Sequence, residues 1–144
     1  MKRHEALIPL SREHHGALLL AQVLKSDVPD YKGMPTLPGE KAAYALETFK
    51  NTLQPHFKKE ELLMQKVMDR NEDLNNLVAE ILNEHTELTE AFLTLQQSEN
   101  LEKSLHLLGE KLTDHIRKEE RVLFPLIEAS CTAGMLNELK YLHQ

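Results

Sequence analysis

The sequence predicts an all-α fold, namely an up-down-up-down four-helix bundle followed by a short C-terminal helix. Apolar residues recur every three or four positions through four long stretches, which is the spacing of one face of an α-helix. Polar or proline-containing breaks separate these stretches, and an aromatic content of only 5% disfavours an all-β fold. With 144 residues, of which 41% are hydrophobic, residues 1–144 are expected to form one domain with a substantial core.

The first helix is expected from about Leu7 to Lys25, and a loop with several prolines and glycines follows over residues 26–39. The second helix is expected over roughly residues 40–70, with Thr52 on its inward stripe. It contains Pro55, which removes a backbone hydrogen bond and clashes with the preceding turn. We therefore expect either a kink just before this proline or a break, after which the helix restarts with the proline in its first turn.

The third helix is expected to follow the polar break at residues 71–73 and to continue to the next break at residues 98–100. The fourth helix then carries an apolar face that includes Val122, and Pro125 should kink or end it. A short terminal helix, from about Gly134 to Leu142, presents apolar residues on one side and should dock onto the bundle.

Charge and cysteine content exclude several classes of function. The formal net charge of −6 disfavours a non-specific nucleic-acid binder, because phosphate contacts need clustered lysines and arginines. The single cysteine, Cys131, cannot form an intrachain disulfide or a cysteine zinc site, and it fits a reducing, cytoplasmic location. No continuous apolar run follows the charged N-terminal residues, so we expect no signal peptide and no membrane span.

Six ionisable residues lie on helix stripes that are otherwise apolar. Four of them form two pairs in which a histidine precedes a glutamate by four positions, so that both side chains share one helix face. The other two are single histidines on the first and third helices. A buried carboxylate has to be neutral or paired with a cation, so this pattern predicts a metal ion held between the helices. The six residues are His14, His56, Glu60, His85, His115 and Glu119.

The same order of residues occurs twice, once from His14 and once from His85: a helix with one inward histidine precedes a helix with His-x-x-x-Glu. A repeat of this kind favours a two-metal site near a pseudo-symmetry axis. Two carboxylates can bridge two metals, and two imidazoles per metal leave positions open for an oxo or hydroxo bridge, water or a small diatomic ligand. Imidazole and carboxylate ligands together accept iron, zinc or manganese.

Two neighbouring histidines of the first helix could bind the metal, and their positions on the helix distinguish them. His14 shares its face with apolar residues, whereas His15 lies beside polar ones, and we therefore favour His14 as the ligand. Lys59 and Lys118, which lie inside the two His-x-x-x-Glu pairs, are expected to face solvent.

From about residue 5 to residue 130, these motifs resemble the hemerythrin-like (HHE cation-binding) domain family. The resemblance implies a four-helix bundle around a centre of two non-heme iron ions. It further implies that His14 and His56 bind one iron, that His85 and His115 bind the other, and that Glu60 and Glu119 bridge them. The segments that carry it are Glu13-His14-His15-Gly16, residues 56–65, Glu84-His85, residues 115–119 and Val122-Leu123-Phe124-Pro125.

Two positions depart from the oxygen carriers of that family. The carriers have a second histidine four residues after the one in the third helix, where this chain has Thr89, which opens one further coordination site or leaves it to water. They also use an aspartate where this chain has Glu120, although the four-residue spacing favours Glu119 as the ligand. The resemblance therefore implies binding or sensing of O2 or NO, or iron handling, rather than reversible oxygen transport. A di-iron redox enzyme and an iron–sulfur cluster repair protein are the alternatives.

Overall fold

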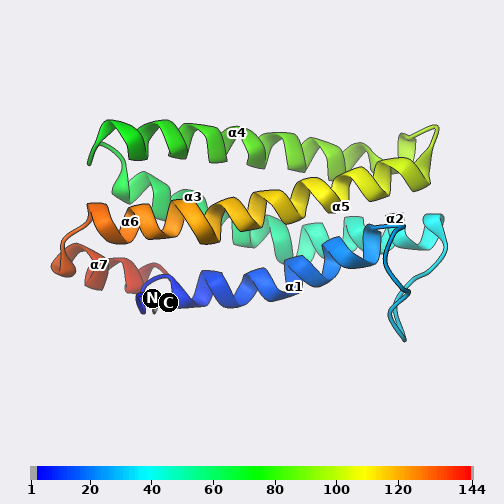
Figure 1. Ribbon diagram of the computed structural model, residues 1–144, viewed down its shortest axis with the longest axis horizontal. Coiled ribbons are helices and arrows are strands. Elements are labelled where there is room, and N and C mark those ends of the chain that lie inside the picture. Colours follow the sequence, from blue (N-terminus) through cyan, green and yellow to red (C-terminus); the bar gives the residue numbers. More distant parts are fainter. Residues whose placement is uncertain (1–2, 144) are drawn as a thin grey trace.

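The computed structural model describes residues 3–143, with side chains described as far as Tyr141, and these residues form helices and no strand. This confirms the predicted all-α bundle. Figure 1 shows α1, α3, α4 and α5 running along the long axis, with α7 at the end where both chain termini lie. The helices are α1 (Ile8–Leu24), α2 (Pro38–Thr48), α3 (Gln54–Val67), α4 (Glu72–Thr94), α5 (Leu101–Lys118), α6 (Phe124–Ser130) and α7 (Ala133–Leu139).

Side-chain caps fix the start of three helices at the polar breaks. The Asn71 side chain accepts a hydrogen bond from the backbone N–H of Leu74 at the start of α4. Asn100 caps α5 in the same way, and the Thr132 hydroxyl caps α7. Each cap satisfies a backbone donor that the first helical turn leaves unpaired. These residues therefore set where the chain turns and how the helices enter the bundle.

Two short π-helical turns carry the long helices through their prolines. The turn η1 (Phe49–Leu53) joins α2 to α3, and η3 (Glu119–Leu123) joins α5 to α6. In each case the residue before the proline, Gln54 or Phe124, donates its N–H to the carbonyl five residues earlier. Because a π-turn takes up one extra residue, the helical conformation continues past the proline. The first proline lies in the first turn of α3, but the helix does not break before it, because η1 joins α2 directly to α3, and the second proline does not end its helix.

The extra residue in each π-turn moves the buried face by one position. The predictions that Thr52 and Val122 face inward are wrong, because both side chains are exposed. The next residues along the chain, Leu53 and Leu123, are buried instead. A uniform helical period cannot anticipate this shift, since it assumes the same number of residues in every turn.

The last helix closes one end of the bundle. Leu136 and Leu139 of α7 are buried, as the apolar pattern of the terminal helix predicts. A 3₁₀ turn, Lys140–His143, follows directly. The same pattern places Leu142 on the apolar face, but the side chain of Leu142 lies outside the described residues.

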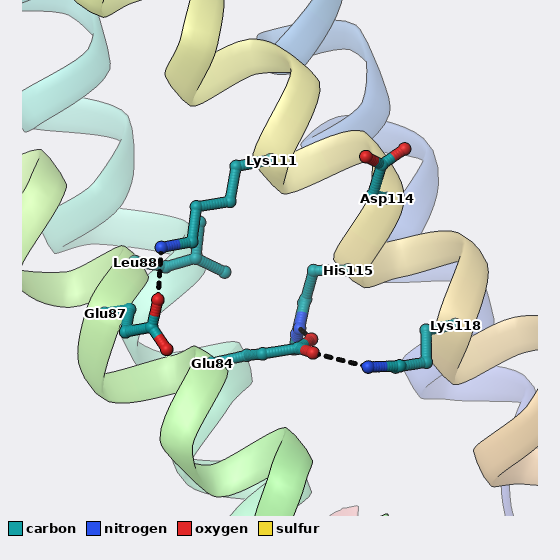
Figure 2. Close-up of a pocket in the computed structure, with 7 residues that line it drawn as sticks. All are labelled: Glu84, Glu87, Leu88, Lys111, Asp114, His115 and Lys118. Carbon is teal, nitrogen blue, oxygen red and sulfur yellow. Dashed lines mark hydrogen bonds and ion pairs between the residues drawn. The ribbon is translucent and has the colours of Figure 1, made fainter.

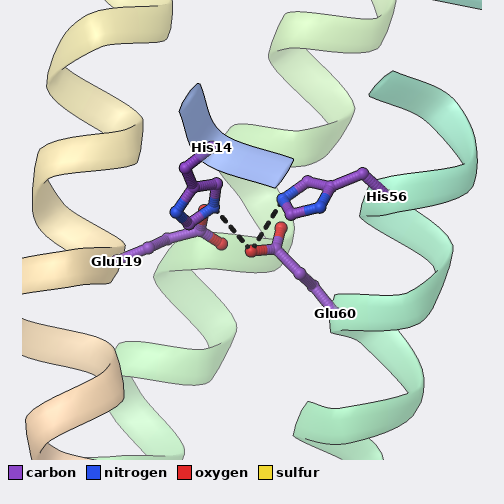
Figure 3. A group of neighbouring side chains, drawn as sticks. All are labelled: His14, His56, Glu60 and Glu119. Carbon is purple, nitrogen blue, oxygen red and sulfur yellow. Dashed lines mark hydrogen bonds and ion pairs between the residues drawn. The ribbon is translucent and has the colours of Figure 1, made fainter. Parts of the chain in front are cut away.

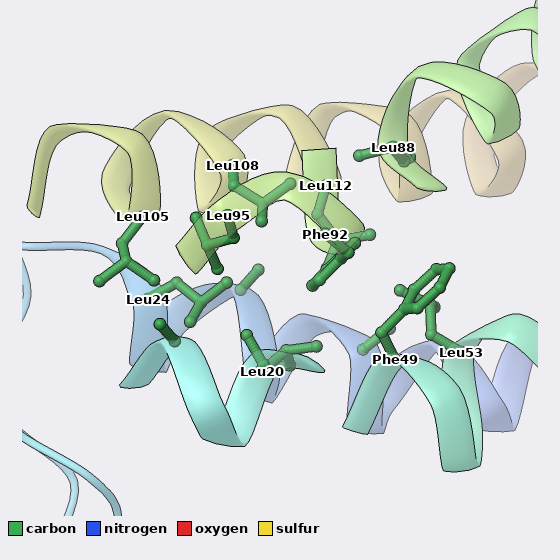
Figure 4. Close-up of a cluster of buried hydrophobic side chains, with 14 of the residues drawn as sticks. Leu20, Leu24, Phe49, Leu53, Leu88, Phe92, Leu95, Leu105, Leu108 and Leu112 are labelled. Atoms are coloured by element: carbon green, nitrogen blue, oxygen red, sulfur yellow. The ribbon is translucent and has the colours of Figure 1, made fainter. Parts of the chain in front are cut away.

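The buried apolar side chains form two clusters, and the ionisable residues lie between them along every long helix. In α4, for example, Ile81 belongs to one cluster and Leu88 to the other, and His85 separates them. Figure 4 shows the cluster farther from α7, in which Phe49 stacks on Phe92. The helices are thus amphipathic, and none in the described part of the chain is long and apolar enough to cross a bilayer.

Gly109 brings α5 into close contact with α1, and we expect Gly109→Ala to destabilise the protein. A Cβ atom at this position would lie 2.6 Å from the backbone carbonyl oxygen of Ala21, so one helix would have to move. Alanine normally gains up to about 1 kcal/mol over glycine in a helix, but overpacking costs about 1–3 kcal/mol and outweighs it. Urea unfolding of the metal-free protein measures the difference. Gly16→Ala in α1 is the control, because nothing lies within 4 Å of its added Cβ, and it should stabilise.

Candidate metal centre

The structure brings all six ionisable residues of the apolar stripes together in the middle of the bundle. Figure 3 shows four of them, with the imidazoles of His14 and His56 beside the carboxylates of Glu60 and Glu119. Both carboxylates are 0% exposed, and the four histidines are 2–3% exposed. His15, the alternative to His14 in α1, is exposed. The six residues come from α1 (His14), α3 (His56 and Glu60), α4 (His85), α5 (His115) and η3 (Glu119).

The six side chains form two overlapping groups with the spacing of metal ligands. Within each group, one ligand atom per residue lies within 4.8 Å of all the others. Both groups contain the two carboxylates, and each adds two histidines, so the arrangement fits two metal ions that share the carboxylates. The first group is His14, His56, Glu60 and Glu119, and the second is Glu60, His85, His115 and Glu119.

Each carboxylate lies close to histidines of both groups. Glu60 Oε2 lies 3.1 Å from Nε2 of His14 and 3.1 Å from Nε2 of His56, while its Oε1 lies 3.2 Å from Nε2 of His85. Glu119 likewise contacts both groups: its Oε1 lies 3.1 Å from His14 Nε2 and 3.4 Å from His115 Nε2. This placement fits two carboxylates that are shared by two metal positions.

Many of the histidine nitrogens and carboxylate oxygens at the centre lie close to one another yet make no hydrogen bond. Six of them have no hydrogen-bond partner in the described part of the chain, because the contacts have ion-pair distances but unfavourable directions. A buried polar group without a partner costs about 1–3 kcal/mol. Metal ions held by these atoms would satisfy all of them at once, so the donor set fits such ions. The six atoms are His56 Nε2, Glu60 Oε1, His85 Nε2, His115 Nε2 and both carboxylate oxygens of Glu119.

In the metal-free protein, the carboxylates favour protonated histidines. Burial by itself lowers the pKa of His14, but the nearby carboxylates of Glu119, Glu120 and Glu60 outweigh burial and raise this pKa to about 11. The same balance raises the pKa of His85 to about 10. Burial raises the pKa of Glu119, yet its histidine neighbours hold that pKa well below the usual range. A metal ion binds the neutral imidazole, so it would replace the additional proton of each protonated histidine.

Four further glutamates, which we call the outer glutamates, hold the other ring nitrogen of each histidine. Every Nδ1 atom lies within hydrogen-bond distance of one carboxylate, so every Nε2 atom is directed to the centre. Such carboxylate–histidine contacts fix the tautomer and orientation of a metal ligand. The Nδ1 to carboxylate distances are 2.8 Å for His56 and Glu13, 2.9 Å for His85 and Glu61, 2.7 Å for His115 and Glu84, and 2.7 Å for His14 and Glu120.

The outer glutamates link the four helices in a closed cycle. Each is the sequence neighbour of a residue at the centre, but it contacts the histidine of the next helix. Glu13 of α1 contacts α3, Glu61 of α3 contacts α4, Glu84 of α4 contacts α5, and Glu120 of η3 contacts α1. This role of the outer glutamates was not predicted from the sequence. Glutamates on the exposed side of a helix are common, so their presence alone does not indicate a role at a metal centre. The one sequence feature that indicates it is the repeated order of Glu-His and Glu-Glu pairs.

Three of the outer glutamates are also paired with a cation. Lys59 and Lys118, which were predicted to face solvent, are half-exposed, and their Nζ atoms lie 2.8 Å from Glu13 and 2.6 Å from Glu84. A guanidinium nitrogen of Arg3 lies 3.2 Å from Glu120. The two lysines occupy the same place in their His-x-x-Lys-Glu motifs, so the internal repeat extends beyond the centre itself.

An all-α bundle with a buried layer of four histidines and two carboxylates defines a metal-binding helical protein. The family model for the hemerythrin HHE cation-binding domain matches residues 8–127 and, in a second and overlapping match, residues 76–144. The chain therefore belongs to the hemerythrin HHE cation-binding domain family, which confirms the resemblance seen in its sequence. No curated protein and no solved structure matches the chain.

Proposed function

We propose that the protein holds two non-heme iron ions and uses them to bind or sense a small ligand such as O2 or NO, or to handle iron. In this proposal, His14 and His56 bind one ion and His85 and His115 bind the other. The observation that carries it is the pair of carboxylates, each of which faces both histidine groups. Zinc and manganese accept the same ligand types, so iron is the part of the proposal that depends most on family membership.

The protein's own residues would prepare the centre for such ligands. The two apolar clusters exclude bulk water from both ends of the polar layer. The outer glutamates keep every Nε2 atom directed inward, so the ligand atoms need little rearrangement when metal binds. Iron would supply reversible one-electron chemistry and open positions for small ligands, and an oxo or hydroxo bridge is part of the proposal.

Absorption spectroscopy of the iron-loaded protein tests this function. We expect an oxo-bridge absorption that appears under oxygen and is lost with a reductant, together with binding of NO by the reduced protein. A spectrum that reverts on deoxygenation supports binding or sensing. Continuous oxygen consumption with turnover would instead indicate the alternative, a di-iron redox enzyme, and a protein that binds no O2 or NO would contradict the proposal.

A further inference from the structure

A cavity of about 410 Å³, which we call the α3–α4 cavity, lies along α4 with Glu61 of α3 at its edge, beside one half of the centre. The imidazole of His85 forms part of its wall, and Thr89 lies one helical turn further along the same face of α4. Thr89 is the position at which the oxygen carriers of the family have another histidine. Because its side chain is short, it leaves open a space that a larger residue would fill.

Each half of the centre carries a stacked phenylalanine: the ring of Phe57 stacks on His85 with centroids 4.0 Å apart, and on the His14 side a guanidinium adds a further layer. The ring of Phe124 stacks on His14 with centroids 5.6 Å apart, and the guanidinium of Arg3 lies 5.4 Å from the centroid of Phe124. Arg3 is fixed there by contacts with Glu120 and Glu128. A ligand that approached His14 from this direction would have to displace all of these contacts.

A second cavity, between α4 and α5, reaches His115, but ion pairs span it. Figure 2 shows Lys111 paired with Glu87 and Lys118 paired with Glu84 across this cavity. No lysine–glutamate pair of this kind spans the α3–α4 cavity, because no lysine or arginine is among its lining residues. Its rim also contains Glu61, which contacts His85 but has no lysine or arginine within 4 Å in the described part of the chain.

We propose that small neutral ligands reach the centre through the α3–α4 cavity and arrive at the metal position formed by His85 and His115. This inference rests on the proposed function and adds to it an entry side and a ligand class. The rim carries the carboxylates of Glu61 and Glu90 without a compensating cation among the lining residues, so it repels anions. Neutral molecules of the size of O2 or NO pass without this electrostatic barrier.

Dissolved oxygen can test the entry side in the zinc-loaded protein, which is diamagnetic. His85 and His14 are both 2% exposed, so burial alone predicts equal access to their ring protons. We expect oxygen to enhance the relaxation of the His85 ring protons more than that of the His14 ring protons. Thr89→Leu should remove this difference, whereas Thr36→Leu, the same substitution in the exposed loop before α2, should not. Equal enhancement at both histidines of the unsubstituted protein would overturn the inference.

Binding kinetics of the reduced, iron-loaded protein test the ligand class, with NO as the neutral probe and azide as the anion. Thr89→Leu should slow NO association by about tenfold, which corresponds to about 1.4 kcal/mol in the entry barrier. Glu90→Lys should accelerate azide binding but not NO binding. An NO rate unchanged by Thr89→Leu, or an azide rate unchanged by Glu90→Lys, contradicts this inference alone. A loaded protein that binds no NO contradicts the proposed function as well.

Discussion

Replacing the two shared carboxylates, in the double variant Glu60→Ala/Glu119→Ala, is expected to reduce bound metal from two ions per chain to nearly none. Each carboxylate faces histidines of both groups, so its loss removes a ligand and a compensating charge from both metal positions. A histidine belongs to only one group. We therefore expect His56→Ala to weaken one position most, and each single glutamate variant to weaken both.

Metal analysis after reconstitution and desalting measures these losses. The control is the double variant Glu47→Ala/Glu138→Ala, which removes the same number of carboxylates from exposed positions of α2 and α7. Circular dichroism establishes that each variant is still helical, and Glu60→Gln/Glu119→Gln, which keeps the side-chain volume, separates lost charge from lost packing. Retention of two metal ions by Glu60→Ala/Glu119→Ala would refute the bridging role of these residues.

Substitution of a single outer glutamate is expected to weaken metal binding by about 10–100-fold, although none of these residues is a proposed ligand. Glu84→Leu removes the acceptor that holds Nδ1 of His115, so the imidazole can rotate and its tautomer is no longer fixed. Glu84→Gln keeps an acceptor oxygen but loses the negative charge, so its effect should be smaller. Competition with a chelator measures the affinity of each variant.

The matched control for this series is Glu87→Gln, one turn further along α4. Glu87 pairs with Lys111 much as Glu84 pairs with Lys118, at 2.7 Å and 2.6 Å, but it contacts no histidine. If the role of Glu84 were only a surface ion pair, the two glutamine variants would have the same metal affinity. Equal affinities of Glu84→Leu, Glu87→Gln and the unsubstituted protein would contradict the orienting role.

The hydrophobic pattern predicted the bundle because burial of an apolar stripe largely determines where a long amphipathic helix lies. The same pattern placed His85 and His115 among apolar residues, and this is why the structure brings them together with the other residues of the stripes. The errors at Thr52 and Val122 have one physical cause, the π-turn before each proline. A proline in a sequence indicates a disturbed helix but does not say how the backbone accommodates it.

The contacts around the centre could not be derived from the sequence, because they join different helices at half-exposed positions. Glu13 and Glu84 each precede a histidine, yet each contacts the histidine of another helix, and only the helix packing determines which one. Nor does the helical period predict that Lys59 turns back toward Glu13, because a lysine on an exposed flank has many possible positions.

Metal stoichiometry of the purified protein is the most direct test of the two-metal centre. After anaerobic reconstitution with ferrous iron and removal of unbound metal, we expect two iron ions per chain. Parallel samples with zinc and manganese show whether the site prefers iron. A stoichiometry near zero with every metal would contradict the assignment of this buried histidine and glutamate layer as a metal centre, and one ion per chain would contradict the pair of metal positions.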